Sequence, residues 1–271
     1  MPRPRITVTL ITLNEEKNLA RALKSVAWAD EKLVIDSGST DRTVEIASEH
    51  GARVIQNPWP GYGRQKNFAQ DHAANDWILN LDADEEVSSD LHREIVGTLD
   101  GLDRDGVDTD RRVASGFEIP RRTWFLGRWI LHGGWYPNHL VRLADRRRGR
   151  WTEPQVHEAW KPFASGEASI ARLTHPLLHY TFASIREQVL TNLRFSNLGF
   201  QELQRRGKRA SLAKLVLKPI GKFLETYLVK RGFLDGLPGL IISVNAAHSM
   251  FLKYAYFFEA EIPTNENPHR R

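Results

Sequence analysis

The sequence contains no cysteine. It therefore holds no disulfide framework and no thiolate metal site, and this composition agrees with a cytoplasmic protein. The apolar stretch at residues 6–11 is too short and too rich in threonine to predict a signal peptide. No internal repeat and no low-complexity tract is present. The histidines between residues 132 and 179 match no zinc-binding spacing, so solvated or hydrogen-bonded side chains are the better interpretation.

What is present is the composition of a globular chain. Its 271 residues are enough for a full core, as one large domain with a smaller addition. Hydrophobic residues make up 41% and charged residues 26%, which is typical of globular, soluble proteins. The net charge of +5 indicates an anionic partner, and nucleic acid, anionic lipid and phosphorylated glycan all satisfy this condition.

An apolar run that ends in acidic residues is the most informative segment. Residues 77–81 predict a buried strand of a parallel sheet, and Asp82, Asp84 and Glu85 follow it directly. Open α/β sheets bind ligands at the carboxyl ends of such strands. On a continuing strand Asp82 and Asp84 would point to one face, where they suit Mg²⁺ or Mn²⁺ with substrate phosphates. The alternative is an acidic helix N-terminus, because residues 88–90 open a helix.

Strand and helix signals alternate over the first hundred residues. Repeated βα units of this kind imply a parallel sheet with helices on both faces. The pattern predicts strands at 6–13, 32–35, 52–56 and 77–81, and helices after Asn14, through 44–47 as far as Gly51, and at 64–73. Beyond them it predicts a charged loop at 100–112, short strands at 114–119, 140–143 and 156–160, and a helix at 184–206 with a Ser184/Glu187 capping box.

A second acidic loop follows the second predicted strand, where Asp36 and Asp41 bracket a Gly-Ser turn. At the carboxyl edge of a sheet these carboxylates can meet a ribose or a base N–H. Taken alone, an ordinary helix N-terminus explains them better. The nucleotide interpretation gains from Asp82 and Asp84, because the two loops would lie side by side on the same edge.

Three motifs in order carry a family resemblance: Thr12–Glu16, Val34–Asp41 and Leu81–Glu85. They resemble glycosyltransferase family 2 over roughly the first hundred residues. The resemblance implies the GT-A fold, an inverting mechanism, a nucleotide-sugar donor and a divalent metal. The family's pattern has two adjacent aspartates before the glycine, whereas the second position here is Ser37.

Candidate roles can be assigned to individual residues. Asp82 and Asp84, as oxygen ligands after a strand, would hold the metal. Arg64 and Lys66 are candidate contacts to the donor phosphates, and solvated surface cations are the alternative. The remaining candidate donor-binding residues are Asn14, Glu15, Asp36, Ser37, Asp41 and Asp82.

Further segments resemble one branch of the family, the inner-core β-1,4-glucosyltransferases of lipopolysaccharide. The resemblance lies in Gly61–Asn67, Phe125–Gly127, Gly134–Pro137 with Arg142–Leu143, and Val156–Glu158. It extends the match to most of the chain. It implies transfer of glucose from UDP-glucose to a core heptose.

An inverting displacement needs a carboxylate that takes the proton from the attacking hydroxyl. Glu158 lies after the acidic motif and beyond the aromatic segment, where the family carries its base. Glu153 competes for this role and Asp145 is a weaker candidate. A surface carboxylate paired with an arginine is the alternative for Glu158.

The acceptor side offers aromatic and basic candidates. Trp135 and Tyr136 can stack on sugar rings, although core packing explains such residues as often. Arg142 and the arginines at 146–150 suit anionic groups of an acceptor, and a solvated basic loop is an equal alternative. His157 is a candidate for holding the diphosphate or orienting Glu158.

The C-terminal part predicts a helical addition. Apolar residues recur at helical spacing between Leu212 and Leu228, beside a row formed by Lys214, Lys218 and Lys222. A basic amphipathic helix suits an anionic bilayer surface, and the alternative is a helix pair packed on the catalytic domain or on a second subunit. The expected organisation is a catalytic domain at 1–183 (donor half 1–100, acceptor half 113–183), a membrane-associating helical region at 184–262 and a disordered tail at 263–271.

The leading hypothesis is thus a glycosyltransferase that acts on a glycolipid at the cytoplasmic face of the inner membrane. A polyprenyl-phosphate glycosyltransferase shares the fold. A nucleotidyltransferase would carry a Gly-rich basic loop after the first strand, where this chain has Leu13–Glu16. A non-enzymatic basic protein that binds membranes or nucleic acid agrees with the charge but leaves the strand-end acids unexplained.

Overall fold

The computed structural model describes residues 4–104, 114–153, 158–163 and 169–261. The chain divides into two compact units. The first contains residues 1–122 and 138–180, and the second contains residues 123–137 and 181–271. The predicted boundary at 183/184 lies near this division, but the hairpin segment at 123–137 groups with the helical part of the chain.

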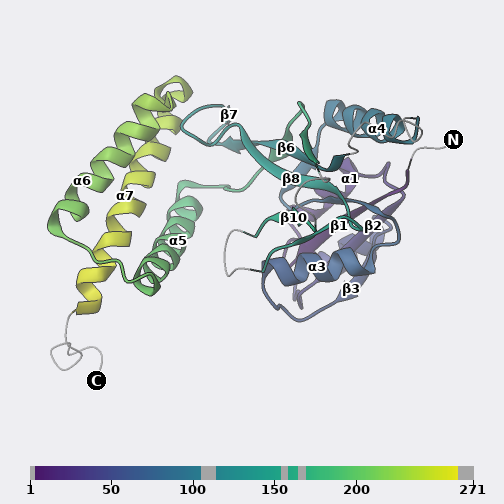
Figure 1. The fold of residues 1–271 in the computed structure, drawn as a ribbon, viewed down its shortest axis with the longest axis horizontal. Coiled ribbons are helices and arrows are strands. Elements are labelled where there is room, and N and C mark those ends of the chain that lie inside the picture. Colours follow the sequence, from purple (N-terminus) through teal and green to yellow (C-terminus); the bar gives the residue numbers. More distant parts are fainter. Residues whose placement is uncertain (1–3, 105–113, 154–157, 164–168, 262–271) are drawn as a thin grey trace. The chain divides into compact units, whose positions relative to one another are not determined.

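The first unit begins with four parallel strands in the order β3-β2-β1-β4 (Figure 1). Their bounds are Ile6–Thr12 (β1), Glu31–Asp36 (β2), Arg53–Gln56 (β3) and Trp77–Asn80 (β4). Connecting helices are Leu19–Ser25 (α1), Thr43–Glu49 (α2) and Tyr62–His72 (α3). This part of the prediction is confirmed. Because β1, β2 and β4 run in one direction, their carboxyl ends meet at one edge of the sheet.

Beyond β4 the sheet becomes mixed, because β8 pairs with β4 in the antiparallel sense. The order continues β8-β6-β12-β5, with β11 beside β6 and with β9 and β10 as a separate pair. The bounds are Glu85–Val87 (β5), Ser89–Arg104 (α4), Ala114–Phe125 (β6), Asn138–Asp145 (β8), Gly149–Trp151 (β9), Trp160–Pro162 (β10), Ser169–Arg172 (β11) and Leu177–His179 (β12). The expected α/β class is therefore confirmed, with parallel pairing largely confined to the first four strands.

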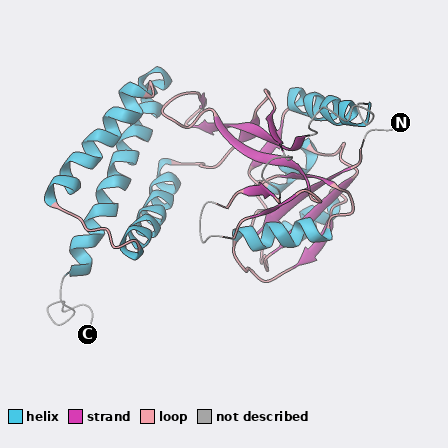
Figure 2. Cartoon of the chain, viewed as in Figure 1, coloured by secondary structure: helices cyan, strands magenta, loops and turns pink. Residues whose placement is uncertain are grey.

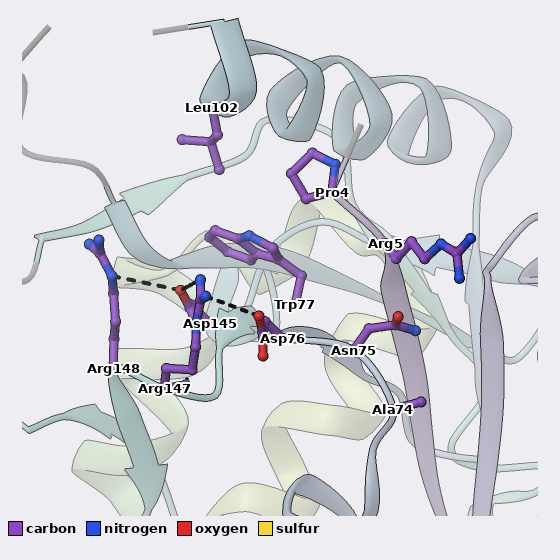
Figure 3. Close-up of a pocket in the computed structure, with 10 residues that line it drawn as sticks. All are labelled: Pro4, Arg5, Ala74, Asn75, Asp76, Trp77, Leu102, Asp145, Arg147 and Arg148. Atoms are coloured by element: carbon purple, nitrogen blue, oxygen red, sulfur yellow. Dashed lines mark hydrogen bonds and ion pairs between the residues drawn. The ribbon is translucent and has the colours of Figure 1, made fainter. Parts of the chain in front are cut away.

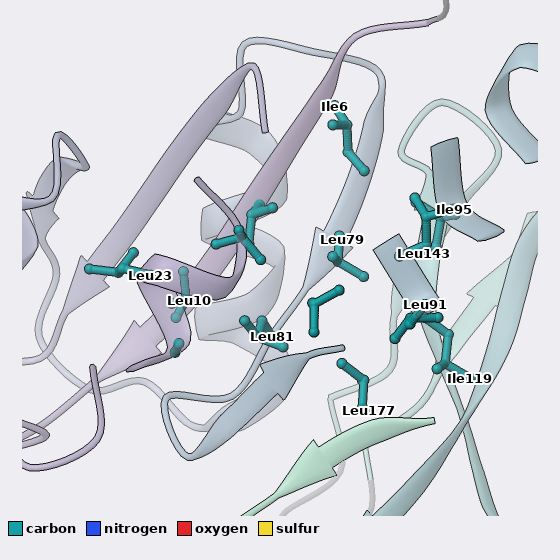
Figure 4. Packing of buried hydrophobic residues seen from close by; sticks show 14 of the residues in the cluster. Ile6, Leu10, Leu23, Leu79, Leu81, Leu91, Ile95, Ile119, Leu143 and Leu177 are labelled. Atoms are coloured by element: carbon teal, nitrogen blue, oxygen red, sulfur yellow. The ribbon is translucent and has the colours of Figure 1, made fainter. Parts of the chain in front are cut away.

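Alternation along the central strands supplies two cores. Ile6, Val8 and Leu10 of β1 face the main cluster, which includes residues of α1, α2 and α4 (Figure 4). Residues of β2 and β4 that point to the opposite face pack with Ala69 and Ala73 at α3. Burial on both sides of the sheet explains the uninterrupted apolar runs at residues 33–35 and 77–79. Replacing a fully buried leucine here with alanine would cost about 2–5 kcal/mol.

The second unit is mainly helical (Figure 2). Its elements are Arg128–Ile130 (β7), which pairs with the end of β6, then Ile185–Arg205 (α5), Leu212–Leu224 (α6), a π-helix at Glu225–Val229 (η1), a 3₁₀ turn at Gly232–Asp235 (η2) and Gly236–Glu261 (α7). The capping box is confirmed: Ser184 Oγ accepts from Glu187 N–H, and the Glu187 carboxylate accepts from Ala183 N–H. The fully buried Asp235 accepts hydrogen bonds from the N–H groups of Leu131 and His132.

Some predicted boundaries differ from the structure. Helix α4 runs through Arg104, so the predicted loop at 100–112 is wrong at its start because the amphipathic pattern of α4 continues there. Residues 105–113 and the predicted tail at 263–271 lie outside the described residues. Helix α6 continues through Pro219. In the described part of the chain, no helix has the length and hydropathy needed to cross a membrane.

Candidate active site

Asp82 and Asp84 follow β4, but the strand does not continue through them. Strand β4 ends at Asn80, and Glu85 N–H closes a turn by donating to Asp82 O at 3.0 Å. The prediction that both side chains lie on one face of a strand is therefore wrong. In the turn, the two carboxylates have different partners.

The Asp82 carboxylate is paired with Arg142 of β8. The Arg142 guanidinium donates to both oxygens of Asp82, to Glu85 Oε1 at 2.7 Å and to Asn80 Oδ1 at 3.0 Å. Its side chain is only 3% exposed and that of Glu85 is fully buried. Burial disfavours the charged form of Asp82, but Arg142 and Lys66 outweigh it and hold the pKa of Asp82 well below its usual range. Arg142, predicted as an acceptor contact, thus neutralises two carboxylates.

Lys66 joins Asp82 to the candidate base. It extends from α3 with 5% of its side chain exposed, and its Nζ donates to Glu158 Oε1 at 2.8 Å. The same nitrogen lies 3.8 Å from Asp82 Oδ1 and 4.6 Å from the centre of the Trp151 ring. Lys66 was predicted to contact donor phosphates, and the structure places it between two carboxylates.

These residues line one cavity of about 460 Å³. Its wall combines basic, acidic and aromatic side chains, a composition that suits a polar ligand bearing charge. The lining includes Lys66, Asp82, Glu118, Arg121, His139, Arg142, Trp151, Glu158, Trp160 and Lys161. Asp82, just after β4, and the candidate base Glu158 therefore line the same cavity.

The Asp84 carboxylate lies beside His179 and outside the Arg142 cluster. His179 Nε2 of β12 lies 3.2 Å from Asp84 Oδ2, and the neighbouring Tyr180 N–H donates to Asp84 O at 2.9 Å. A carboxylate and an imidazole can hold a divalent ion whose other ligands come from a diphosphate and water. Among the residues that the structure describes, no group of three or more acidic or histidine side chains is arranged to hold an ion alone.

The predicted donor loops after β1 and β2 are locked together. Asn14 N–H donates to Ser39 Oγ at 2.8 Å, and Thr40 N–H donates to Asn14 Oδ1 at 2.8 Å. Asp36 is fully buried and accepts hydrogen bonds from Thr12 Oγ1 and from the N–H groups of Gly38 and Ser39. The Asp36 side chain therefore fixes the shape of its own loop.

Glu15 and Asp41 complete this edge. Glu15 N–H donates to Thr43 Oγ1 at 2.7 Å, and Thr43 N–H donates to Asp41 Oδ1 at 3.0 Å. Burial, with further contributions from Asp84, Asp41 and Asp82, raises the pKa of Glu15. Repulsion from the neighbouring carboxylates therefore adds to the effect of burial on Glu15. Ser37 Oγ accepts from Gln65 Nε2 at 3.1 Å.

The two other base candidates lie elsewhere. Glu153 is 45% exposed and accepts from Arg64 Nε at 3.0 Å and from Asn67 Nδ2 at 3.1 Å, which lowers its pKa. Gly63 allows this approach, since a Cβ there would lie 2.0 Å from Thr152 O. Arg64 and Lys66 of α3 thus hold Glu153 and Glu158, the residues that flank 154–157.

Asp145 pairs with Trp77, the first residue of β4, so it lies at the opposite edge of the sheet from Asp82. There it lines a pocket of about 450 Å³ with Asp76, Arg147 and Arg148 (Figure 3). Arg147 pairs with Asp145 and Asp76, and Arg148 with Asp145. This geometry argues against Asp145 as the base and favours a solvated basic loop at residues 146–150.

The remaining acceptor candidates are in the second unit or outside the described residues. Trp135 packs against Phe125 and Phe182, with ring centres 5.7 and 6.0 Å away, so it contributes to a core. Tyr136 precedes a cis peptide bond to Pro137. His157 lies outside the described residues. Glu85, His179 and Trp151 were not predicted as site residues. Of the three, only Glu85, the last residue of the motif Leu81–Glu85, carried a signal in the sequence.

Comparison with known proteins identifies relatives over nearly the whole chain. The family model described as glycosyl transferase family 2 matches residues 7–193. A protein of Rickettsia typhi named as an uncharacterized glycosyltransferase is 31% identical, over 95% of this chain and 88% of that protein. The lipopolysaccharide core biosynthesis glycosyltransferase LpsC of Rhizobium meliloti is 30% identical, over 96% of this chain and 94% of LpsC. The crystal structure of S. aureus TarS 1-349 in complex with UDP-GlcNAc is 13% identical, with a TM-score of 0.45 over 94% of this chain and 91% of that chain.

Proposed function

Because the chain belongs to glycosyl transferase family 2 and is a glycosyltransferase, we propose that it transfers glucose from UDP-glucose to the core of lipopolysaccharide or to a similar glycolipid. Transfer proceeds by a single, inverting displacement. The choice of glucose follows the resemblance of segments such as Gly61–Asn67 to inner-core glucosyltransferases. The choice of acceptor also follows the name of the R. meliloti relative, which matches over most of both chains.

One observation carries this proposal: Lys66 holds Glu158 in the same cavity as Asp82. Asp82 follows a central parallel strand, where ligands of such sheets bind. Glu158 is 16% exposed, so it is accessible to an acceptor hydroxyl and partly shielded from water. A carboxylate beside the predicted donor site is what an inverting transfer requires.

Each of the site residues has its own role in the proposed reaction. The acceptor oxygen forms a bond to the anomeric carbon while the bond from that carbon to the diphosphate breaks, and UDP leaves with the electron pair. Glu158 receives the proton of the acceptor hydroxyl. Lys66 orients Glu158 before this step through their hydrogen bond. Arg64, which is exposed on α3, is a candidate contact to the diphosphate.

Asp84 and His179 would hold a Mg²⁺ or Mn²⁺ ion, and Asp82 lies next to them in the turn. Bound there, the ion would supply positive charge for the departing diphosphate. The donor set of one carboxylate and one imidazole fits an ion that keeps phosphate and water ligands. Asp82 is a weaker ligand candidate, because Arg142 occupies both of its oxygens.

The donor loops would bind the nucleotide. The edge next to Asp82 contains Asn14 and Glu15 after β1, and Ser37 and Asp41 after β2. Asp36 shapes the loop after β2. A glycolipid acceptor also places the reaction at a membrane, which we take to be the cytoplasmic face of the inner membrane.

Calorimetric titration tests the donor. UDP-glucose, UDP-galactose and UDP-N-acetylglucosamine are each titrated with Mg²⁺ or Mn²⁺ present, and again with EDTA. We expect UDP-glucose to bind most tightly, with affinity that depends on the metal. If another UDP-sugar binds more tightly, that sugar and not glucose is the donor. If none of the three UDP-sugars binds, the proposed reaction is contradicted.

A further inference from the structure

Helix α6 of the second unit exposes an unusually apolar surface. None of its side chains is buried. Leu212, Val216, Leu217, Ile220 and Leu224 are between 45% and 70% exposed. At 3.6 residues per turn these five side chains fall within an arc of roughly 140°. Large contiguous apolar patches are rare on monomeric proteins in water and mark interaction sites.

Exposed apolar residues continue beyond the end of α6. They lie in η1, in η2 and at the start of α7, and each is between 45% and 76% exposed: Leu228, Val229, Phe233, Leu234 and Leu237. The apolar face therefore extends over consecutive elements of one unit. A single exposed apolar side chain needs no explanation, whereas ten exposed apolar side chains between residues 212 and 237 require one.

A row of lysines lies on the side of α6 opposite the apolar arc. Lys214, Lys218 and Lys222 follow one another at i, i+4 spacing. Lys222 pairs with Glu225 at 3.1 Å, whereas neither Lys214 nor Lys218 has an ion pair with any residue that the structure describes. Burial, together with repulsion from Lys222, lowers the pKa of Lys253 on α7. The surface therefore carries more positive charge than its own carboxylates neutralise.

A groove between α6 and α7 joins the two features. It has a volume of about 490 Å³. Lys214, Lys218 and Lys222 line it together with the apolar residues Ala213, Leu217, Gly221 and Met250, and with Glu225. Cations next to apolar side chains match a molecule that has an anionic head and a hydrocarbon tail.

We propose that α6 and the α6–α7 groove dock on an anionic lipid bilayer, with the phosphate of an anionic phospholipid held by the lysine row. A helix of this kind lies in the interface, with its apolar arc in the acyl boundary and its lysines among the head groups. A second copy of the chain is a poorer occupant, since its own lysine row would face this one. This assignment adds the surface that contacts the membrane and the class of lipid that it binds. It rests on the proposed function only for the choice of leaflet.

Vesicle flotation of the full chain tests the proposal without donor or acceptor. We expect binding to phosphatidylcholine vesicles that contain about 30 mol% phosphatidylglycerol, weaker binding at high salt, and little binding to pure phosphatidylcholine. Lys214→Gln with Lys218→Gln should lower the partition coefficient on the order of 30-fold. Leu217→Gln should lower it at unchanged charge.

Matched variants serve as controls. Lys24→Gln with Arg93→Gln removes two exposed charges from the first unit and should leave binding unchanged. Leu190→Gln removes a leucine that is 54% exposed on α5, and should also have no effect. Equal losses in the controls, or equal binding to neutral vesicles, would overturn the proposal. Light scattering that shows a dimer dissociated by Leu217→Gln would assign the face to a second copy. UDP-glucose titration of the same variants should be unchanged, which keeps this test separate from that of the donor.

Discussion

Lys66 Nζ lies 2.8 Å from Glu158 Oε1 and 3.8 Å from Asp82 Oδ1, so one buried cation connects the candidate base to the acidic turn after β4. The ring of Trp151 covers the same nitrogen at 4.6 Å. The charge of this ammonium contributes to the lowered pKa of Asp82. Its hydrogen bond also limits where Glu158 can move, since the two side chains are only 5% and 16% exposed.

Lys66→Met should therefore lower kcat/KM, mainly through kcat, because Glu158 loses the hydrogen bond that orients it toward the acceptor hydroxyl. Lys66→Arg retains a charged donor and should restore kcat in part. Steady-state kinetics that separate kcat from the KM for UDP-glucose would measure both variants. A Met variant with wild-type kcat would exclude a role for Lys66 in placing the base.

Glu158→Gln should reduce kcat by about 10²–10⁴-fold while UDP-glucose binding is retained, because the amide keeps the shape of the side chain but cannot take a proton. Glu153→Gln is the matched control. Glu153 is exposed and bound by Arg64, so its variant should retain most of the activity. Kinetics and calorimetry on the two variants decide between them. If Glu153→Gln gives the larger loss in kcat, the base is Glu153.

Asp84→Asn should abolish activity without unfolding the protein, and His179→Gln should weaken metal-dependent UDP binding at least about 10-fold, since both side chains are proposed ligands. His175→Gln provides a histidine control, because His175 is 46% exposed and pairs with Glu94. Titration of UDP with Mn²⁺ or EDTA measures the effect. Metal dependence that survives in His179→Gln would remove this residue from the site, and near wild-type turnover of Asp84→Asn would remove Asp84.

Arg142→Met should destabilise the first unit by about 3–5 kcal/mol, because it leaves the carboxylates of Asp82 and Glu85 without their shared buried partner. Arg150→Met is the surface control. Arg150 and its partner Asp71 are 45% and 48% exposed, so the change should cost no more than about 1 kcal/mol. Urea unfolding of both variants would provide the comparison. Equal costs would show that the Arg142 cluster contributes nothing beyond a surface pair.

The sequence predicted the parallel half of the sheet well. Strands β1 and β4 are buried on both faces along almost their whole length, so their patterns are unambiguous. The acidic residues after them were therefore placed correctly at the carboxyl edge. The antiparallel half was predicted only in fragments. The pattern indicated strands at 114–119 and 140–143, whereas β6 and β8 extend further, to polar residues such as Arg121 and Asp145 that find partners within the fold.

The partners within the site were not predictable from spacing. As an arginine, Arg142 suits an anionic ligand. Only the pairing of β8 with β4 in the structure shows that it contacts Asp82. His179 is far from Asp84 in the sequence and reaches it because β12 pairs with β5. Long-range pairing of this kind depends on the packing of the whole unit, and no local pattern records it.

The anchoring of Glu153 and Glu158 by α3 has a consequence for engineering. Arg64 and Lys66, two residues apart on one rigid helix, hold the two ends of the segment that contains both candidate bases. A library made to change the acceptor should therefore leave Arg64 and Lys66 unaltered, because both anchors come from α3 and not from the segment itself. Other positions can then vary without loss of the contact that holds the proton-accepting group. Position 63 should stay glycine in every member, since even alanine would collide with Thr152.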